Sequence, residues 1–123
     1  QMWVFNEDGF FSTVVDRDDP TVLAVRSRDE MSIARFCRHV GIDPHVEAVF
    51  TPERDYQVRV RVPKAVWVGY MASKADGLDY VDYKSHMTER MHAGGFEFKQ
   101  LKTLSAIWSI MVDHWEVRSM DDR

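Results

Sequence analysis

Cysteine is almost absent from this chain of 123 residues, which contains only Cys37. A single cysteine cannot form an internal disulfide, so the chain is not a disulfide-rich secreted scaffold, and we expect a reducing, cytoplasmic setting. Long apolar runs are also lacking, because no stretch approaches the roughly 20 residues that a membrane-spanning helix needs. The opening segment, Met2 to Phe5, lacks the basic flank and long apolar core of a signal peptide. We therefore predict no association with membranes.

A strong charge of one sign is missing as well. The formal net charge is −4, which is too small for an acidic nucleic-acid mimic and has the wrong sign for a protein that grips phosphates with most of its surface. The charge is uneven, since residues 1–55 carry 6 basic and 11 acidic groups, whereas residues 56–102 carry 8 and 5. Only this central segment is expected to present a basic surface.

Apolar material is sufficient for one compact core, because 45% of the residues are hydrophobic and 12% are aromatic. We predict a single α+β domain over residues 2–118, followed by a frayed C-terminal tail at residues 119–123.

Five segments have the composition or the alternation of β-strands, and the clearest is Tyr56 to Val62, where apolar residues alternate with polar ones. The residues Asn6 to Gly9 suit a tight turn between the first two strands, and a second turn precedes the third, which predicts a three-stranded meander. The turn at Thr51 to Asp55 predicts a second hairpin. The five predicted strands are Met2–Phe5, Phe10–Val15, Thr21–Arg28, Val46–Phe50 and Tyr56–Val62.

Helices are predicted between and after these strands. Asp29 is a typical N-cap, and a stripe of apolar residues, from Ile33 to Val40, ends at Gly41, which suits a left-handed C-cap. Pro63 suits the first position of a second helix, and Asp79 with Asp82 imitates a capping box for a third. The four predicted helices cover about Asp29–Val40, Pro63–Ala75, Asp79–Met91 and Phe98–Val117.

The order of these elements does not alternate strictly between strand and helix, as a doubly wound parallel sheet requires. We therefore predict a largely antiparallel sheet of about five strands with helices mainly on one face. The stretch from Thr21 to Ala75 has part of a ferredoxin-like order.

Four motifs together resemble a family of small bacterial and phage proteins that has no assigned activity. They are Met2-Trp3-Val4-Phe5 with Gly9-Phe10-Phe11-Ser12, Asp55-Tyr56-x-Val58-Arg59-x-x-Val62-Pro63, Asp79-Tyr80-x-Asp82-Tyr83-Lys84, and Ile107-Trp108-x-Ile110-Met111. The resemblance implies a bacterial or phage accessory protein and transfers no functional residue to this chain.

Two sets of residues are candidate binding sites. Arg26, Arg28, Arg59 and Arg61 fall on alternate strand positions, so they can share one sheet face and hold phosphates or acidic side chains. Alternatively, they form a solvated face paired with neighbouring acids, and no stacking aromatic residues alternate with Arg59 and Arg61 as an RNA-binding platform requires. The second set is Tyr80, Tyr83 and Lys84, whose spacing places them on one helical face. They form either a recognition patch or a structural plug at the sheet edge.

Metal-binding and catalytic patterns are not recognisable. The histidines, cysteine and acids near Cys37 lack the spacing of a zinc site, and no nucleophile motif occurs. We predict no metal, no cofactor and no catalytic residue.

The last predicted helix has an apolar surface wider than one packing partner requires. One stripe runs from Leu101 to Trp115, and a second beside it consists of Ile107, Ile110, His114 and Val117. We expect part of this surface to be covered within the chain and the second stripe to form a symmetric dimer.

The function expected from the sequence is that of a small non-enzymatic accessory protein that binds a protein partner, as an adaptor or an inhibitor. The alternative is binding of nucleic acid or a phosphate ligand through the arginine-bearing sheet face.

Overall fold

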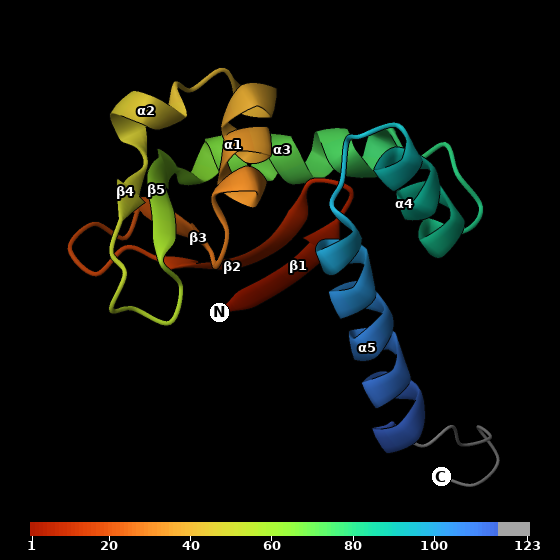
Figure 1. Cartoon of the computed structure of the whole chain (residues 1–123). Helices are drawn as coiled ribbons and strands as arrows, with labels where there is room; N and C mark the ends of the chain where they lie inside the picture. Colours follow the sequence, from red (N-terminus) through yellow and green to blue (C-terminus); the bar gives the residue numbers. More distant parts are fainter. Residues whose placement is uncertain (116–123) are drawn as a thin grey trace, which may run out of the picture. The chain divides into compact units, whose positions relative to one another are not determined.

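The computed structural model describes residues 1–115, and their contacts divide the chain into two compact units, Gln1–Leu78 and Asp79–Arg123. Within the described residues, the first unit contains a five-stranded antiparallel sheet with helices, and the second contains helices (Figure 1). The predicted α+β fold class is confirmed. The single domain over residues 2–118 stays a prediction, and residues 116–118 and the predicted tail at 119–123 lie outside the described residues.

The sheet consists of β1 (Met2–Asn6), β2 (Gly9–Val15), β3 (Val22–Ser27), β4 (Val49–Phe50) and β5 (Val58–Pro63). Its strands lie in the order β1-β2-β3-β5-β4, and all neighbours are antiparallel. The first three strands form the predicted meander. The last two form the predicted hairpin, and β5 pairs with β3.

The turn of the first hairpin is closed by a local hydrogen bond, because the Asn6 side chain accepts from the backbone N–H of Asp8 at 2.9 Å. Gly9 has a φ of +138°, which disfavours any residue with a Cβ. A Cβ at this position would also collide with the side chain of Ser32 on the neighbouring helix. Glycine therefore lets the hairpin approach the helix.

That helix, α1 (Glu30–Val40), begins and ends where the sequence predicts. The Asp29 carboxylate accepts from the backbone N–H of Ser32 at 2.8 Å, which satisfies one of the free donors at the helix start. Gly41 adopts a φ of +79° and donates to the carbonyl of Cys37.

The predicted strand Val46–Phe50 is largely wrong. Its first residues belong to a short helix, α2 (Pro44–Glu47), and only the last two form β4. Asp43 caps this helix by accepting from the N–H of His45 at 2.9 Å, and Pro44 occupies a first-turn position that tolerates its missing N–H. These two signals outweigh the β-propensity of Val46.

Two of the remaining three helices differ from the predictions at their starts, whereas the last begins at Phe98 as predicted. Pro63 is the N-cap of α3 (Lys64–Asp76) and is also the last residue of β5, so it is not the first helical residue. Asp79 does not cap a helix, because α4 (Tyr83–His92) begins later, with Asp82 as its N-cap. The last helix is α5 (Phe98–His114), and its predicted end at Val117 lies outside the described residues.

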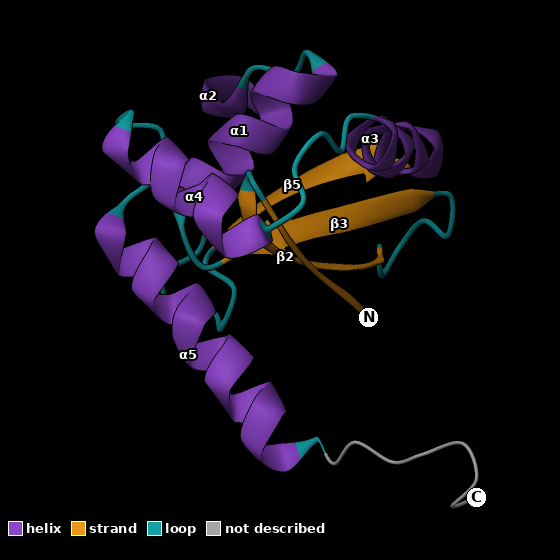
Figure 2. Ribbon diagram, turned by 90° about the vertical axis from the view of Figure 1, so that its right-hand side faces the viewer, coloured by secondary structure: helices purple, strands orange, loops and turns teal. Residues whose placement is uncertain are grey.

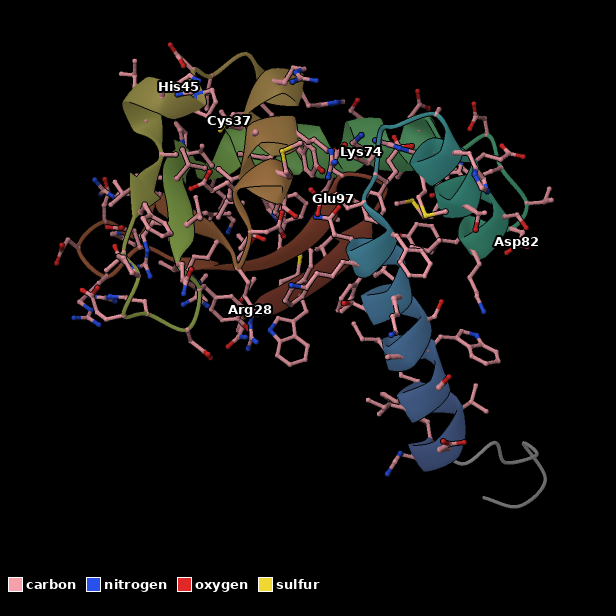
Figure 3. The ribbon with its side chains drawn as sticks, viewed as in Figure 1. Arg28, Cys37, His45, Lys74, Asp82 and Glu97 are labelled. Atoms are coloured by element: carbon pink, nitrogen blue, oxygen red, sulfur yellow. The ribbon has the colours of Figure 1, made fainter. Side chains whose placement is uncertain are left out.

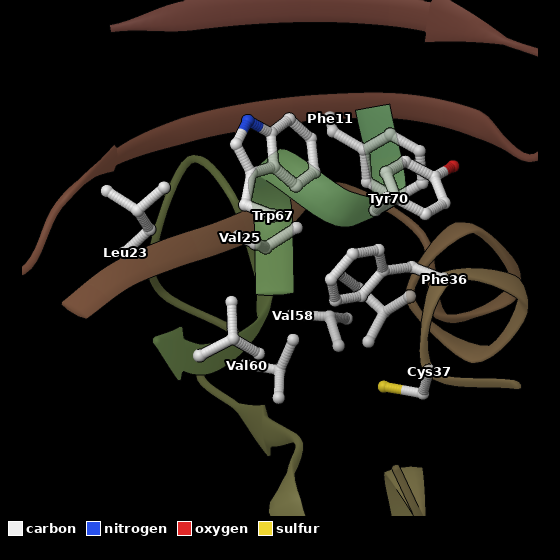
Figure 4. Close-up of a cluster of buried hydrophobic side chains, with 11 residues drawn as sticks. Phe11, Leu23, Val25, Phe36, Cys37, Val58, Val60, Trp67 and Tyr70 are labelled. Atoms are coloured by element: carbon white, nitrogen blue, oxygen red, sulfur yellow. The ribbon is translucent and has the colours of Figure 1, made fainter. Parts of the chain in front are cut away.

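The core of the first unit lies between one face of the sheet and the helices α1 and α3, which Figures 1 and 2 show on the same side of the strands. Figure 4 shows how side chains from all these elements meet. The cluster consists of Phe11, Leu23, Val25, Ile33, Phe36, Cys37, Val58, Val60, Val62, Trp67 and Tyr70. None of the described helices combines the length and the hydropathy needed to cross a membrane.

Candidate binding surfaces

The face of the sheet opposite α1 and α3 carries Arg26, Arg59 and Arg61 of the first candidate set, while Arg28 follows the last residue of β3. Side chains that face each other in antiparallel register point to the same side of a sheet. Ser12 pairs with Arg26, Arg26 pairs with Arg59, and Ala24 pairs with Arg61. Since Val58 and Val60 point into the core, Arg59 and Arg61 point away from it. We call this side of the sheet the open face.

Two of these arginines gather around Tyr56. The guanidinium of Arg26 donates to the backbone oxygen of Ser12 at 3.2 Å and to its Oγ at 2.9 Å, and lies 4.7 Å from the Tyr56 ring centre. Arg28, labelled in Figure 3, lies 5.5 Å from the same ring. It also forms a 3.5 Å ion pair with Asp55, but both side chains are exposed, so the pair contributes little to stability.

Arg61 and Arg59 differ in their partners. Arg61 donates two hydrogen bonds to the Asp16 carboxylate, at 2.8 and 3.0 Å, and these raise the pKa of Arg61 and lower that of Asp16. By contrast, the Nε of Arg59 is buried and has no hydrogen-bond partner among residues 1–115. Burial lowers the pKa of Arg59, and the positive charges of Arg54 and Arg26 lower it further. Arg61 therefore fits the interpretation of a surface arginine paired with an acid, whereas Arg59 fits that of an arginine able to hold a phosphate or an acidic side chain.

Aromatic side chains on the open face are a feature that the sequence analysis missed. Trp3 pairs in register with Ser12, and Phe5 pairs with Phe10. The ring of Phe10 stacks on Phe5 at 4.4 Å, meets Trp3 edge-on at 5.9 Å, and lies 6.2 Å from Tyr56. Trp3 and Phe5 lie two residues apart in the first strand and therefore on the same face, which is the signal in the sequence that points to these aromatic residues. Only the register of the strands places them beside the arginines.

The second candidate set does not share a helical face. Tyr80 lies before α4, so its predicted place on the helix is wrong, and its ring stacks on His86 at 4.0 Å. The rings of Tyr80 and Tyr83 are 6.2 Å apart, while the Lys84 ammonium lies 4.8 Å from the ring centre of Trp108 in α5. The structure thus brings the two tyrosines together and directs Lys84 to another helix of the same unit.

The predicted dimer interface lies on α5, a helix of 17 residues that contains no buried residue. Ile107 is half-buried, His114 is exposed, and Ile110 is 57% exposed. Val117 lies outside the described residues.

A cluster of polar side chains in the first unit was not foreseen. The hydroxyl of Tyr70 donates to the Asp8 carboxylate at 2.6 Å and accepts from the amide of Asn6 at 2.9 Å. Lys74, labelled in Figure 3, donates to Glu7 at 3.0 Å and lies 2.9 Å from the Asp8 carboxylate. Burial, and then the hydrogen bond to Asp8, raise the pKa of Tyr70 far above its usual range, so its phenol stays protonated and is a poor base. These hydrogen bonds and ion pairs link the first hairpin to α3.

Little in the described residues suggests a metal site or an activated nucleophile. Within residues 1–115, no three histidine, cysteine, aspartate or glutamate side chains gather as a metal site would require. The thiol of Cys37 is buried, and burial raises its pKa, which keeps it in the unreactive form.

No protein-family model matches the chain, and neither a curated protein nor a solved structure is detectably similar to it. The open face and α5 are therefore the two features of the described residues that bear on function.

Proposed function

We propose that the chain is a small non-enzymatic accessory protein that binds a protein partner, as an adaptor or an inhibitor, through the apolar surface of α5. The observation that supports this proposal is that none of the large apolar side chains of α5 is buried. The exposed ones are Phe98, Trp108, Ile110, Met111 and Val112, together with Trp115 just after the helix.

The width of this surface favours a protein as the occupant. At 100° per residue, the apolar positions of α5 extend over roughly 240° of the helix, whereas a helix that packs on one neighbour shows a stripe only somewhat over about 100° wide. The opposite strip is narrow and contains Lys99, Lys102, Ala106, Ser109 and Asp113. A contiguous apolar patch of this kind is typical of an interface, and an amphipathic helix commonly binds in a hydrophobic groove.

A second copy of the chain is the simplest partner that this surface fits. Ile107, Ile110 and His114 would then meet their twofold equivalents, because a twofold interface brings the same patch of both subunits together. We propose this homodimer as the state of the protein without its partner.

The proposed setting is the cytoplasm of a bacterium or of a phage-infected cell. The buried, unpaired thiol of Cys37 suits a reducing compartment. The bacterial or phage host follows from the resemblance described above.

The test compares three immobilised proteins in a lysate of such a host, with captured proteins identified by mass spectrometry. The native chain and Ala106→Glu are expected to capture the same partner, because Ala106 lies on the polar strip. Met111→Glu should lose it, since Met111 is 48% exposed and lies near the middle of the apolar arc. Calorimetry with the purified partner then measures the loss, and circular dichroism confirms that each variant keeps its helices.

Light scattering of the native chain and Ile110→Glu tests the homodimer. We expect the native mass to be that of two chains and the variant to be monomeric. A native monomer would contradict the homodimer, and capture that is equal for all three immobilised proteins would contradict the role of α5.

A further inference from the structure

We propose that the open face of the sheet binds single-stranded nucleic acid, with bases stacked on Trp3 and phosphates held by Arg59 and Arg26. This second activity is independent of the proposed binding through α5.

The arginine pair supplies the phosphate site. Arg26 and Arg59 lie directly opposite each other on β3 and β5, and like charges in this position destabilise a sheet unless an anion lies between or beside them. Arg61 and Arg28 have carboxylate partners, in Asp16 and Asp55. Arg59 is half-buried and has no carboxylate partner among the described residues, so a phosphate at the accessible part of its guanidinium would balance its charge.

The aromatic residues supply the stacking surface. Trp3 is 61% exposed, so one face of its indole is available, while Phe10 supports the ring from the edge. Phe5 stacks on Phe10 next to it and is also exposed. Bases stack on such rings whatever their sequence, which is the mode that single-strand binders use.

The register places the two parts in one line across the sheet. Trp3, Ser12, Arg26 and Arg59 are consecutive partners on β1, β2, β3 and β5. Neighbouring strands are about 4.8 Å apart, so the row from Trp3 to Arg59 spans roughly 14 Å. A short single strand can follow this row with a base at one end and phosphates at the other. A duplex keeps its bases stacked inside and cannot use the Trp3 ring.

The test is fluorescence anisotropy with fluorescein-labelled 12-nucleotide oligo(U) and oligo(dT), and with a blunt 12-base-pair duplex. We expect both single strands to bind more tightly than the duplex. With two phosphates neutralised, the slope of log affinity against log salt is about −1.4, so a rise from 50 to 200 mM NaCl should weaken binding roughly sevenfold.

Three variants locate the site. Trp3→Leu keeps an apolar side chain but removes the ring, and should weaken binding roughly 5- to 150-fold. Arg59→Gln should weaken binding and reduce the magnitude of the salt slope by about 0.7. Arg38→Gln is the matched control, because Arg38 is an exposed arginine on α1, which packs against the other side of the sheet, and it should bind like the native chain.

An NMR titration of the native chain with oligo(U) keeps the test independent of variant folding. The indole N–H signal of Trp3 should shift, while that of the buried Trp67 stays in place. Absence of binding at 50 mM NaCl and 100 μM protein would overturn the proposal. So would equal affinity for the duplex with no effect of Trp3→Leu, which would indicate general attraction to polyanions.

Discussion

Lys74 is partly buried, and its neighbours keep its ammonium charged. Burial alone would lower the pKa of its ammonium, but the hydrogen bonds and charges of Asp8 and Glu7 outweigh burial and raise it. The phenol of Tyr70, which shares the Asp8 carboxylate, also has a raised pKa. Both groups therefore hold their protons more tightly in the folded chain than in the unfolded one.

This arrangement predicts a fold that loses stability in alkali. The unfolded pKa values are about 10 for tyrosine and about 10.4 for lysine, so above pH 10 the folded state binds more protons and the free energy of unfolding falls. Their stabilising contribution is complete below these values and is lost as the pH rises through the folded ones. Tyr70→Phe should remove a slope of up to about 1.4 kcal/mol per pH unit.

Urea unfolding at pH 8 to 11.5 measures this dependence. Lys74→Arg, which keeps the positive charge but does not titrate in this range, should also flatten the curve. A free energy of unfolding that is constant up to pH 11.5 in the native chain would show that the cluster does not couple folding to protonation.

The contact between the first hairpin and α1 depends on a glycine. Gly9→Ala would combine an unfavourable positive φ with a collision against Ser32, and we expect a loss of roughly 2–4 kcal/mol. Gly69→Ala is the matched control, because Gly69 lies within α3 and a Cβ there would meet no neighbouring element within 4 Å. It should stabilise the chain by up to about 1 kcal/mol. Thermal unfolding of both variants makes the comparison, and equal effects would contradict the close approach of hairpin and helix.

Elements whose signals are local were predicted well. Asp29 and Gly41 lie at the two ends of α1, and both caps involve residues only a few positions away. The segment after it shows where such reasoning fails, since Val46 and Phe50 suggested a strand while Asp43 and Pro44 capped a helix. A sequence pattern gives no relative weight to two short signals that overlap.

Only the arginines of the open face could be predicted from the sequence, because the aromatic residues are brought beside them by pairing between strands. The four arginines alternate within single strands, so their shared face follows from the sequence. The proximity of Trp3 to Arg26 depends instead on the register of three strands, which the sequence does not reveal before the sheet is formed. The partners of these arginines, such as Asp16 for Arg61, come from distant turns for the same reason.

The two units of the chain differ in where their apolar residues lie. All members of the core cluster belong to residues 1–78, and α1 and α3 cover one face of the sheet within that unit. In the other unit, α5 leaves its largest apolar side chains exposed. The first unit therefore contains the hydrophobic core expected of an independent domain, whereas the second exposes apolar side chains as a binding element does.

This difference predicts that a chain ending at Leu78 folds without the rest. It should show the dispersed amide signals of a β-sheet protein and a single cooperative urea transition, because every helix and strand that contributes to the core cluster is retained. It should keep affinity for oligo(U), since the open face belongs to it, and lose partner capture, since α5 does not. The full chain, measured alongside, is the control for both activities. If the shortened chain is unfolded, the second unit contributes to the stability of the first, and the single domain over residues 2–118 is the correct description.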